Sequence, residues 1–405
     1  MNIIIVSHLY PTPRNSVPGI FVHQQAQALQ DRGHSVRVIS PTPYVPSIPY
    51  LPDRWARFRD TPDHSQLDGV NVSYPKYISL PSRHTLPLVA KSVRRTVDNA
   101  ISDLTSNSGF SPDVINAHVP LPDGYACLPA SRRLNIPLVT TVHGNSIQVS
   151  SKNRLCRRQI RTVFQSSDEM VFNSEVLLGK AKKHFDGLTQ VRVVPNGVPI
   201  AKLQSASSAK LPDSFSENRM VVASVGSLQP TKGQGDVLEA LQDLPTGSRP
   251  NYLLIGDGPQ RAELEQKAVT LDSPVHFAGS VSHEDVFSYL KSTDIMALPS
   301  IEEAFGIAYI EAMACESTVI GCEGEGPSEF VENGETGYLV PPNDPKAITD
   351  ILTDLLDNQS KVQQIGKKAS ECVLNNLTWA KNARKTEEIY QSAIENRSSS
   401  LNYSP

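Results

Sequence analysis

Two carboxylates eight residues apart stand where a predicted strand passes into a predicted helix. Glu303 follows the apolar run 295–298 and precedes the helix, whereas Glu311 lies within it. A carboxylate offers two hydrogen-bond acceptors, so Glu303 could bind hydroxyl groups of a sugar and Glu311 those of a ribose. The plainer interpretation makes Glu303 a solvated loop residue and Glu311 part of a polar helix face. Because Glu311 has apolar neighbours in the sequence, we expect it to be partly buried and to need a partner.

Backbone amides and one lysine in the second half of the chain suit an anionic group such as a diphosphate. The amides of Phe305, Gly306 and Ile307 open the same predicted helix, where free donors and the positive helix end attract an anion. Gly226 ends an earlier predicted strand, and Lys232 follows it at the mouth of the next helix. A lysine ammonium is a compact charge suited to phosphate, although surface lysines are common.

Three weaker signals occupy similar positions elsewhere. Gly256 opens a Gly-Asp-Gly-Pro turn after a predicted strand, where glycines more often serve the turn than a ligand. His143 directly follows the predicted strand 138–142, at an end where ligands bind parallel sheets. Gly19 precedes the predicted helix 21–32, a place where a diphosphate or an acceptor could approach. A lone histidine is more often structural than catalytic.

Short apolar strands alternate with amphipathic helices along the whole chain, which is typical of parallel sheets covered by helices on both faces. Strands are predicted at residues 3–7, 36–40, 70–74, 114–117, 138–142, 170–172, 191–194, 221–225, 252–255, 275–277, 295–298 and 318–321. Helices are predicted at residues 21–32, 89–104, 235–244, 260–269, 285–291 and 307–315, with a helical tail over 346–396. A proline-rich stretch at 41–62 favours an irregular excursion, and the polar stretch 199–218 favours an interdomain linker. The pattern therefore predicts an α/β protein of two doubly wound domains, 1–198 and 199–379, facing a cleft.

Composition narrows the class of protein. The chain has 405 residues, enough for two domains, and its 38 Lys and Arg against 42 Asp and Glu give a net charge of -4. This balance argues against a nucleic-acid partner. The five cysteines are scattered without metal-ligand spacing, which favours reduced thiols in a cytoplasmic protein. No segment has the features of a signal peptide or a membrane-spanning helix, so we expect a cytoplasmic location.

These motifs together resemble the retaining GT-B glycosyltransferases of family GT4, also called glycosyltransferases group 1, over essentially the whole chain. The most specific mark is the family's Glu-x7-Glu pattern, matched by Glu303 and Glu311. The other matches are Gly226 with Lys232, the turn at Gly256, the base-receiving segment with Gly279 and Val281, the hinge 195–198, Arg32 to Val36, Glu329, 333–337 and Trp379.

The resemblance implies a GT-B fold of two Rossmann-like domains, with a last helix, about 380–405, crossing back onto the acceptor-binding N-terminal domain. The C-terminal domain would bind a nucleotide-sugar donor, most often a UDP-sugar. Lys232 would contact the diphosphate, Glu303 the sugar hydroxyls, and His143 the neighbourhood of the donor sugar. The acceptor would be a glycan or a polyprenyl-linked sugar, in polysaccharide or glycoconjugate biosynthesis.

Two positions depart from the family pattern. Ser227 stands where many members have an arginine, which leaves Lys232 and backbone amides to hold the diphosphate. Gly19 is single where a glycine pair is frequent. No Asp-x-Asp motif is present, so we expect neither a metal ion nor another cofactor in the chemistry.

A basic cluster suggests peripheral contact with an anionic membrane surface. Arg154, Arg157, Arg158 and Arg161 recur at helical spacing among apolar residues, and 91–95 carries a further group of cations. Such faces favour anionic lipids. Ordinary solvated helix faces explain the same pattern.

Other functions use similar architecture. A nucleotide-sugar epimerase would turn over a donor without any acceptor. A phosphorylase would need a pyridoxal lysine, for which the sequence has no signal. A non-catalytic nucleotide-sugar-binding protein would bind a donor without transfer, and Ser227 is the residue that favours this alternative.

Overall fold

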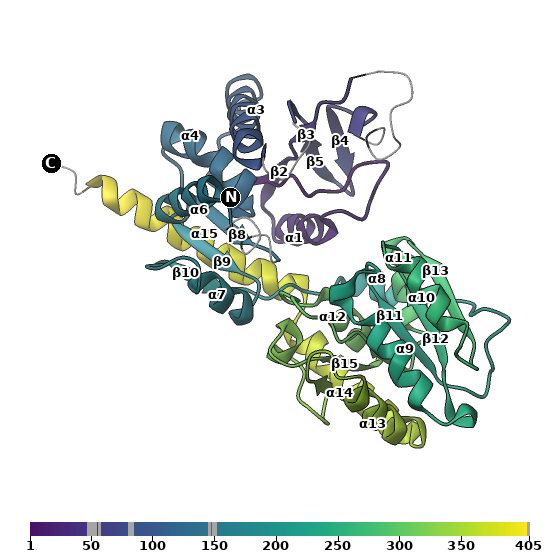
Figure 1. The fold of residues 1–405 in the computed structure, drawn as a ribbon. Coiled ribbons are helices and arrows are strands. Elements are labelled where there is room, and N and C mark those ends of the chain that lie inside the picture. Colours follow the sequence, from purple (N-terminus) through teal and green to yellow (C-terminus); the bar gives the residue numbers. More distant parts are fainter. Residues whose placement is uncertain (47–54, 56–57, 80–84, 145–146, 148–151, 403–405) are drawn as a thin grey trace. The chain divides into compact units, whose positions relative to one another are not determined.

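The computed structural model describes residues 1–46, 55, 58–79, 85–144, 147 and 152–402 (Figure 1). The chain divides into two compact units. The first contains Met1–Pro195 together with Trp379–Pro405, and the second contains Asn196–Thr378. No helix among the described residues is long and apolar enough to cross a membrane.

The first unit is built on a sheet whose strand order is β10-β9-β8-β7-β1-β2-β5-β4. Neighbouring strands are parallel except β4, which pairs antiparallel with β5 at the edge. The elements of this unit are β1 Asn2–Val6, α1 Ile20–Asp31, β2 Ser35–Ile39, β3 Thr42–Pro43, β4 His64–Leu67, β5 Val70–Ser73, β6 Lys76–Tyr77, α3 Leu86–Asn107, β7 Val114–His118, η2 Pro120–Gly124, α4 Tyr125–Leu134, β8 Leu138–Val142, α6 Arg154–Ser166, β9 Glu169–Phe172, α7 Glu175–Lys182, β10 Val191–Val193 and α15 Trp379–Asn402.

Alternation along the strands gives this sheet two apolar faces. In β1, Ile3 and Ile5 join the cluster under α1 and α15, whereas Ile4 and Val6 join the cluster under α3 and α4. Successive strand residues point to opposite faces, so a fully apolar strand indicates helices on both sides. The last helix, α15, therefore completes the first unit (Figure 1).

The second unit has a parallel sheet with the strand order β13-β12-β11-β14-β15-β16. Its two faces are covered by α11, α12 and α14 on one side and by α9, α10 and α13 on the other. Its elements are α8 Ile200–Ser205, β11 Val221–Val225, η3 Pro230–Lys232, α9 Gln234–Asp243, η4 Thr246–Ser248, β12 Asn251–Ile255, α10 Arg261–Ala268, β13 Val275–Gly279, α11 His283–Leu290, β14 Ile295–Ala297, α12 Ile307–Ala314, β15 Thr318–Cys322, η5 Gly326–Glu329, β16 Gly337–Val340, α13 Pro345–Leu356 and α14 Gln359–Asn376.

The linker predicted at 199–218 is wrong. Helix α8 lies within this stretch, and Leu203 is buried against the core of the second unit. Leu211 and Phe215 pack against the same core, and Ala209 N donates a hydrogen bond to Ser288 O (2.9 Å). A few well-placed apolar side chains thus anchor a segment whose average composition is polar.

Candidate active site

The order of strands in the second unit identifies a ligand site. The chain leaves β11 for β12 on one side and later returns to place β14 on the other side. Ligands of open α/β sheets bind outside the carboxyl ends of the strands at such a switch point. The loops that follow β11 and β14 carry Lys232 and Glu303, and their side chains form an ion pair of 2.6 Å between Nζ and Oε2.

Local contacts hold these two loops together. Ile301 N donates to Thr231 O (2.9 Å), and Ser300 Oγ lies within donating distance of two acceptors, Thr231 O (3.2 Å) and Glu303 Oε2 (3.3 Å). Gly233 caps α9 with φ 74°, and a Cβ atom there would lie 2.7 Å from Pro299 O. Only glycine permits this approach, which positions Lys232 beside the second loop.

The loop after β14 is shaped to start helix α12. Glu302 has a positive φ of 63°, and Gly306 caps the helix with φ 97°. Gly326 N donates to the backbone oxygen of Glu303 (3.0 Å). The Phe305 side chain is 3% exposed and packs in the core beside Phe330. Only its backbone amide is therefore left for the predicted role of binding an anion. Ile307 begins α12, where first-turn amides remain available to an anion.

Three predicted glycines come together at the ends of adjacent strands. Gly226 N donates to Ile255 O (2.9 Å), and Gly256 N donates to Gly279 O (2.8 Å). A Cβ atom on Gly256 would lie 2.0 Å from Gly226 O, whereas one on Gly226 would meet nothing within 4 Å. Gly256 is therefore needed for packing of the loops, and Gly226 borders open space.

Two further predicted residues belong to this edge of the sheet. The backbone oxygen of Ser227 accepts a hydrogen bond from Gln234 Nε2 (3.2 Å). Val281, two residues beyond Gly279, is partly buried against the core. Neither observation assigns these residues a ligand.

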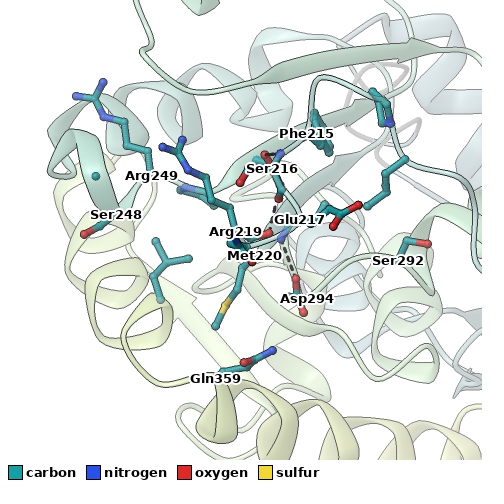
Figure 2. A pocket seen from close by; sticks show the side chains of 18 of the residues that line it. Phe215, Ser216, Glu217, Arg219, Met220, Ser248, Arg249, Ser292, Asp294 and Gln359 are labelled. Atoms are coloured by element: carbon teal, nitrogen blue, oxygen red, sulfur yellow. Dashed lines mark hydrogen bonds between the residues drawn. The ribbon is translucent and has the colours of Figure 1, made fainter.

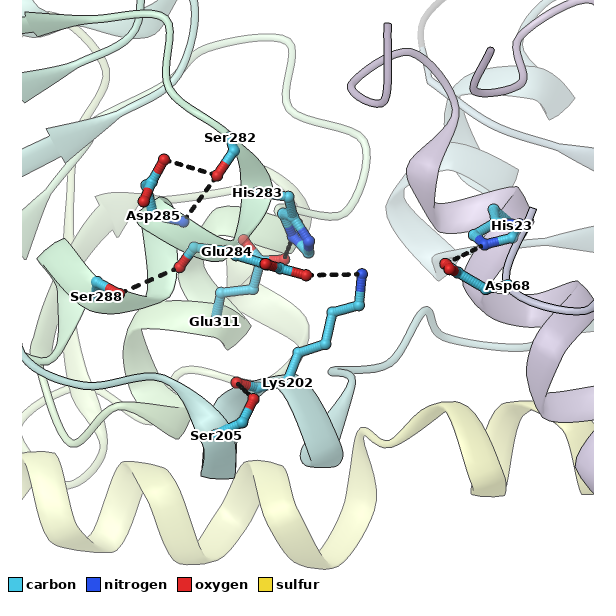
Figure 3. A network of polar contacts seen from close by, with 10 residues as sticks. All are labelled: His23, Asp68, Lys202, Ser205, Ser282, His283, Glu284, Asp285, Ser288 and Glu311. Atoms are coloured by element: carbon cyan, nitrogen blue, oxygen red, sulfur yellow. Dashed lines mark hydrogen bonds and ion pairs between the residues drawn. The ribbon is translucent and has the colours of Figure 1, made fainter. Parts of the chain in front are cut away.

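Glu311 has a partly buried partner that the sequence interpretation missed. Its Oε1 lies 2.6 Å from His283 Nε2, and the two side chains are 5% and 14% exposed (Figure 3). His283 is the first residue of α11, which Ser282 caps by accepting a hydrogen bond from Asp285 N (3.1 Å). The signal in the sequence was a histidine at a capped helix start just after the segment with Gly279 and Val281.

In the first unit, His143 belongs to a pair of histidines. His118 Nδ1 lies 2.9 Å from His143 Nε2, and the two rings stack with centroids 5.1 Å apart. Burial lowers the pKa of His143 to about 3. Burial and then the neighbouring His143 hold the pKa of His118 well below its usual value. Both rings are therefore neutral near pH 7, a state in which each can donate through one nitrogen and accept through the other.

Gly19 connects the first strand's loop to helix α1 in the same region. It caps α1 with φ 68°, and a Cβ atom there would lie 2.0 Å from Leu9 O. Phe21 in the first turn of α1 contacts His143, with ring centroids 4.7 Å apart. The structure thus brings the glycine loop and His143 together, and it adds His118, the last residue of β7, which the sequence interpretation missed.

A hollow of about 1060 Å³ lies at the amino ends of the strands of the second sheet, opposite the carboxyl ends that carry Lys232 and Glu303 (Figure 2). Its lining includes Ser216, Arg219 and Asp294, next to the amino ends of β11 and β12. Asp294 accepts a hydrogen bond from Val221 N (2.8 Å). This hollow is therefore separate from the glycine loops and from the Lys232–Glu303 pair.

Comparison with known protein families accounts for both units. The model of glycosyl transferases group 1 matches residues 209–371, and the model of glycosyltransferase family 4 matches residues 19–202. The chain is a family 4 glycosyltransferase. Both carboxylates of the Glu-x7-Glu pattern lie in the first match, and His143 lies in the second.

Related glycosyltransferases align over most of the chain. A teichuronic acid biosynthesis glycosyltransferase of Bacillus subtilis is 26% identical and covers 98% of this chain and 99% of its own length. The N-acetyl-alpha-D-glucosaminyl L-malate synthase of Bacillus anthracis is 26% identical over 70% of this chain and 75% of its own.

Solved structures share the GT-B fold of this family 4 glycosyltransferase. Sucrose-phosphate synthase from Thermosynechococcus elongatus superposes with a TM-score of 0.77 at 20% identity, covering 98% of this chain and all of the other. HepE of Anabaena, solved with UDP-glucose, gives a TM-score of 0.71 at 19% identity, covering 97% and 100% of the two chains. The two Rossmann-like units predicted from the strand and helix pattern are confirmed.

Proposed function

We propose that this glycosyltransferase moves a hexose from a UDP-sugar to a glycan or a lipid-linked glycan with retention of anomeric configuration, as a step of polysaccharide or glycoconjugate biosynthesis. The observation that carries the proposal is the Lys232–Glu303 pair at the switch point of the second sheet. It places a cation, a carboxylate and the start of a helix where a diphosphate and its sugar would lie.

Each residue of this site has a distinct role in the proposal. The Lys232 ammonium has three donors, so it can keep Glu303 and still bind oxygens of the departing diphosphate. The amides of Gly306 and Ile307 stabilise the same developing charge. Glu303 orients sugar hydroxyls, and Glu311 binds ribose hydroxyls with His283 fixing one of its oxygens.

The nucleotide base would lie against the segment with Gly279 and Val281, with Gly226 and Gly256 bordering the nucleotide. Ser227 supplies no cation, so Lys232 carries most of the charge compensation for the diphosphate. We assign the second unit, close to the predicted range 199–379, to the donor. The first unit, close to 1–198 with the last helix, takes the acceptor.

Bond making follows the charge distribution of the site. The bond between the anomeric carbon and the diphosphate breaks through an oxocarbenium-like transition state. The acceptor hydroxyl attacks from the same face, and its proton passes to the departing diphosphate oxygen. His143 and Gly19 lie in the first unit, where His143 would contact the donor sugar and the Gly19 loop would border the diphosphate or the acceptor. No metal ion takes part, so transfer should continue in the presence of a chelator.

The names of relatives direct the choice of donor to test first. HepE was solved with UDP-glucose, which supports a UDP-sugar. A relative from Corynebacterium glutamicum is named a GDP-mannose-dependent mannosyltransferase and is 24% identical over 80% of this chain. GDP is therefore the alternative nucleotide, and the relative named for teichuronic acid biosynthesis supports a glycan acceptor.

The deciding experiment is a thermal-shift comparison of UDP, GDP, ADP and CDP, each with and without magnesium. A ligand that binds only the folded protein raises its melting temperature with concentration. We expect UDP to give the largest shift, independent of magnesium, and NMR of the transfer product to show the anomeric configuration of the donor. A nucleotide shift without any transfer would support the non-catalytic alternative, and turnover without acceptor would support the epimerase.

Charge supports contact of the first unit with an anionic lipid surface. Its residues include 26 Lys and Arg against 16 Asp and Glu, whereas the second unit has 12 against 26. Arg154, Arg157, Arg158 and Arg161 are exposed on α6 and line a shallow hollow together with Thr162 and Gln165. A partner with phosphate groups would be attracted to this face.

Flotation with vesicles of anionic lipid tests the contact. We expect the Arg158→Ala/Arg161→Ala variant to float less than the wild type. The Lys182→Ala/Lys183→Ala variant, which loses the same charge at the C-terminal end of α7, should float like the wild type. Equal flotation of all three proteins would contradict a lipid-binding role for α6.

A further inference from the structure

A second charged pair bridges the switch point of the first sheet. The chain places β2 on one side of β1 and β7 on the other, so the crevice at their carboxyl ends lies between β1 and β7. His8 follows β1, and Asp123 follows β7 in the turn Pro120–Gly124. Asp123 Oδ2 lies 2.9 Å from His8 Nδ1 and also accepts a hydrogen bond from His8 N (3.1 Å).

The two side chains differ in exposure: the carboxylate is buried where it can orient the imidazole, and the imidazole reaches solvent where it can meet a ligand. The Asp123 side chain is fully buried, whereas the His8 side chain is 30% exposed. Burial lowers the pKa of His8, but the Asp123 carboxylate outweighs burial and leaves that pKa raised. Above this raised pKa His8 is neutral, and because the carboxylate accepts from Nδ1–H, Nε2 then presents its lone pair as an acceptor; below it Nε2 carries a proton and donates instead.

Asp123 itself calls for an explanation. Its Oδ1 is buried and has no hydrogen-bond partner in the described part of the chain. Burial raises the pKa of Asp123, against the effect of His8. A buried carboxylate that is only half satisfied costs stability, and such groups concentrate at functional sites.

His8 borders a pocket of about 200 Å³ whose other described lining residues suit a neutral, hydroxyl-bearing group. Prolines and aromatic rings form much of the wall, with threonine and serine hydroxyls between them. The tyrosines of the lining stay neutral. Burial and the nearby Asp123 carboxylate raise the pKa of Tyr77 to about 12, and burial raises that of Tyr10 well above its ordinary value.

The Tyr10 hydroxyl of this wall is already held in place. Tyr10 Oη lies 2.8 Å from His23 Nδ1, and His23 Nε2 lies 3.0 Å from Asp68 Oδ2 (Figure 3). Among the described lining residues, neither a lysine nor an arginine is present. The pocket is smaller than the sites that hold drug-sized ligands, so it suits a single sugar ring. The lack of a lysine or arginine among its described lining residues disfavours a phosphate-bearing group.

We propose that this pocket binds the terminal neutral sugar of the acceptor, and that His8, held by Asp123, accepts the hydrogen bond of one of its hydroxyl groups. The assignment rests on the proposed function for its reaction, because the bound sugar also carries the hydroxyl that attacks the donor. That attacking hydroxyl is a different one from the hydroxyl bound by His8, so its proton still passes to the departing diphosphate oxygen. His8 is thus an acceptor-binding residue, and Asp123 is a positioning residue that acts through it.

Saturation-transfer NMR with UDP present tests the pocket with defined probes. The probes are the neutral methyl glycosides of glucose, galactose and N-acetylglucosamine, with methyl glucuronide as the anionic comparison. In His8→Asn the side-chain amide can still donate to Asp123, as Nδ1 does, but no polar atom remains at the position of Nε2. In His8→Gln the longer side chain places an amide at the position of Nε2 again. We expect at least one neutral glycoside to bind wild type, about 10-fold weaker binding to His8→Asn, and partial recovery in His8→Gln.

A double-mutant cycle separates positioning from folding. Asp123→Asn should weaken glycoside binding in wild type and have little further effect in His8→Asn, since coupled residues are not additive. Additive losses, binding that ignores His8, preference for the glucuronide, or binding of no neutral glycoside would each overturn the proposal. The UDP thermal shift, measured on the same samples, reports the donor site alone. If wild type showed no UDP thermal shift, the proposed function would be refuted. The dependence of glycoside binding on His8 would be a separate result that this outcome does not change.

Discussion

Lys232 Nζ lies 2.6 Å from Glu303 Oε2, although 71 residues of sequence separate the two side chains. They come from the loops after β11 and β14, which flank the switch point of the second sheet. The two groups are 26% and 17% exposed, so the pair is partly desolvated and its Coulomb interaction is stronger than that of a surface pair. The pair thereby holds a cation ready at the start of helix α12.

Replacing Lys232 with alanine should abolish the response to nucleotide and most of the transfer. Removal of one group that stabilises developing charge typically costs about 100- to 1000-fold in turnover. The measurement is transfer rate together with the UDP thermal shift. Lys346→Ala, which removes an exposed lysine paired with Asp350 in the same unit, is the matched control and should behave as wild type. Full activity of Lys232→Ala would remove the diphosphate role from this residue.

Glu311 should govern nucleotide affinity through its carboxylate. Glu311→Gln should weaken UDP binding by about 10- to 100-fold, the usual range for a hydrogen bond to a charged group. Titration calorimetry measures this change. Glu284 is the neighbour of His283 in the sequence, and the Glu284 side chain is 76% exposed. The Glu284→Gln variant should therefore leave UDP affinity unchanged. Equal affinity of the two variants would show that Glu311 serves only its histidine partner.

The sheet-and-helix plan could be predicted because each strand carries its own signal. Ile3 to Val6 form a continuous apolar run, and a strand buried on both faces requires such a run. Every strand predicted from these runs is present, and so are the helices between them, because amphipathic spacing specifies a helix locally. Other segments were missed, such as β16 Gly337–Val340 and helix α8.

The pairings within the site could not be predicted. The sequence places Glu311 in a helix, but only the packing of α11 against α12 brings His283 to it. In the same way, His118 and His143 meet because β7 and β8 are neighbours in the sheet. Strand order is decided by the whole fold, so the sequence indicates which residues reach the carboxyl edge and not which of them touch.

Gly256 should be essential for the folding of the second unit. A Cβ atom at this position would lie 2.0 Å from Gly226 O, and its φ of 140° strains any other residue. Gly256→Ala should therefore lower the free energy of unfolding by at least about 2 kcal/mol. Gly247→Ala is the control, because a Cβ atom there would meet nothing within 4 Å. Equal urea midpoints for the two variants would contradict the close packing of these loops.

The neutral pair His118 and His143 should make stability depend on pH. Burial lowers the pKa of His143 to about 3, and burial and its neighbour lower that of His118 in the same direction. In the unfolded chain each imidazole would protonate near pH 6.5, so between that value and the folded pKa the unfolded state binds more protons. The stability contributed by the neutral pair is therefore fully present above about pH 6.5 and is lost progressively as the pH falls toward 3.

The measurement is the melting temperature of the first unit's transition at a series of pH values from 7 to 4. His118→Gln cannot protonate, so its melting temperature should fall less steeply than that of wild type over this range, even if it is lower at pH 7. His184→Gln replaces an exposed histidine of the same unit and should keep the wild-type slope. Parallel curves for all three proteins would mean that carboxylates alone set the acid sensitivity, and that the histidine pair titrates in the folded protein as it does in the unfolded chain.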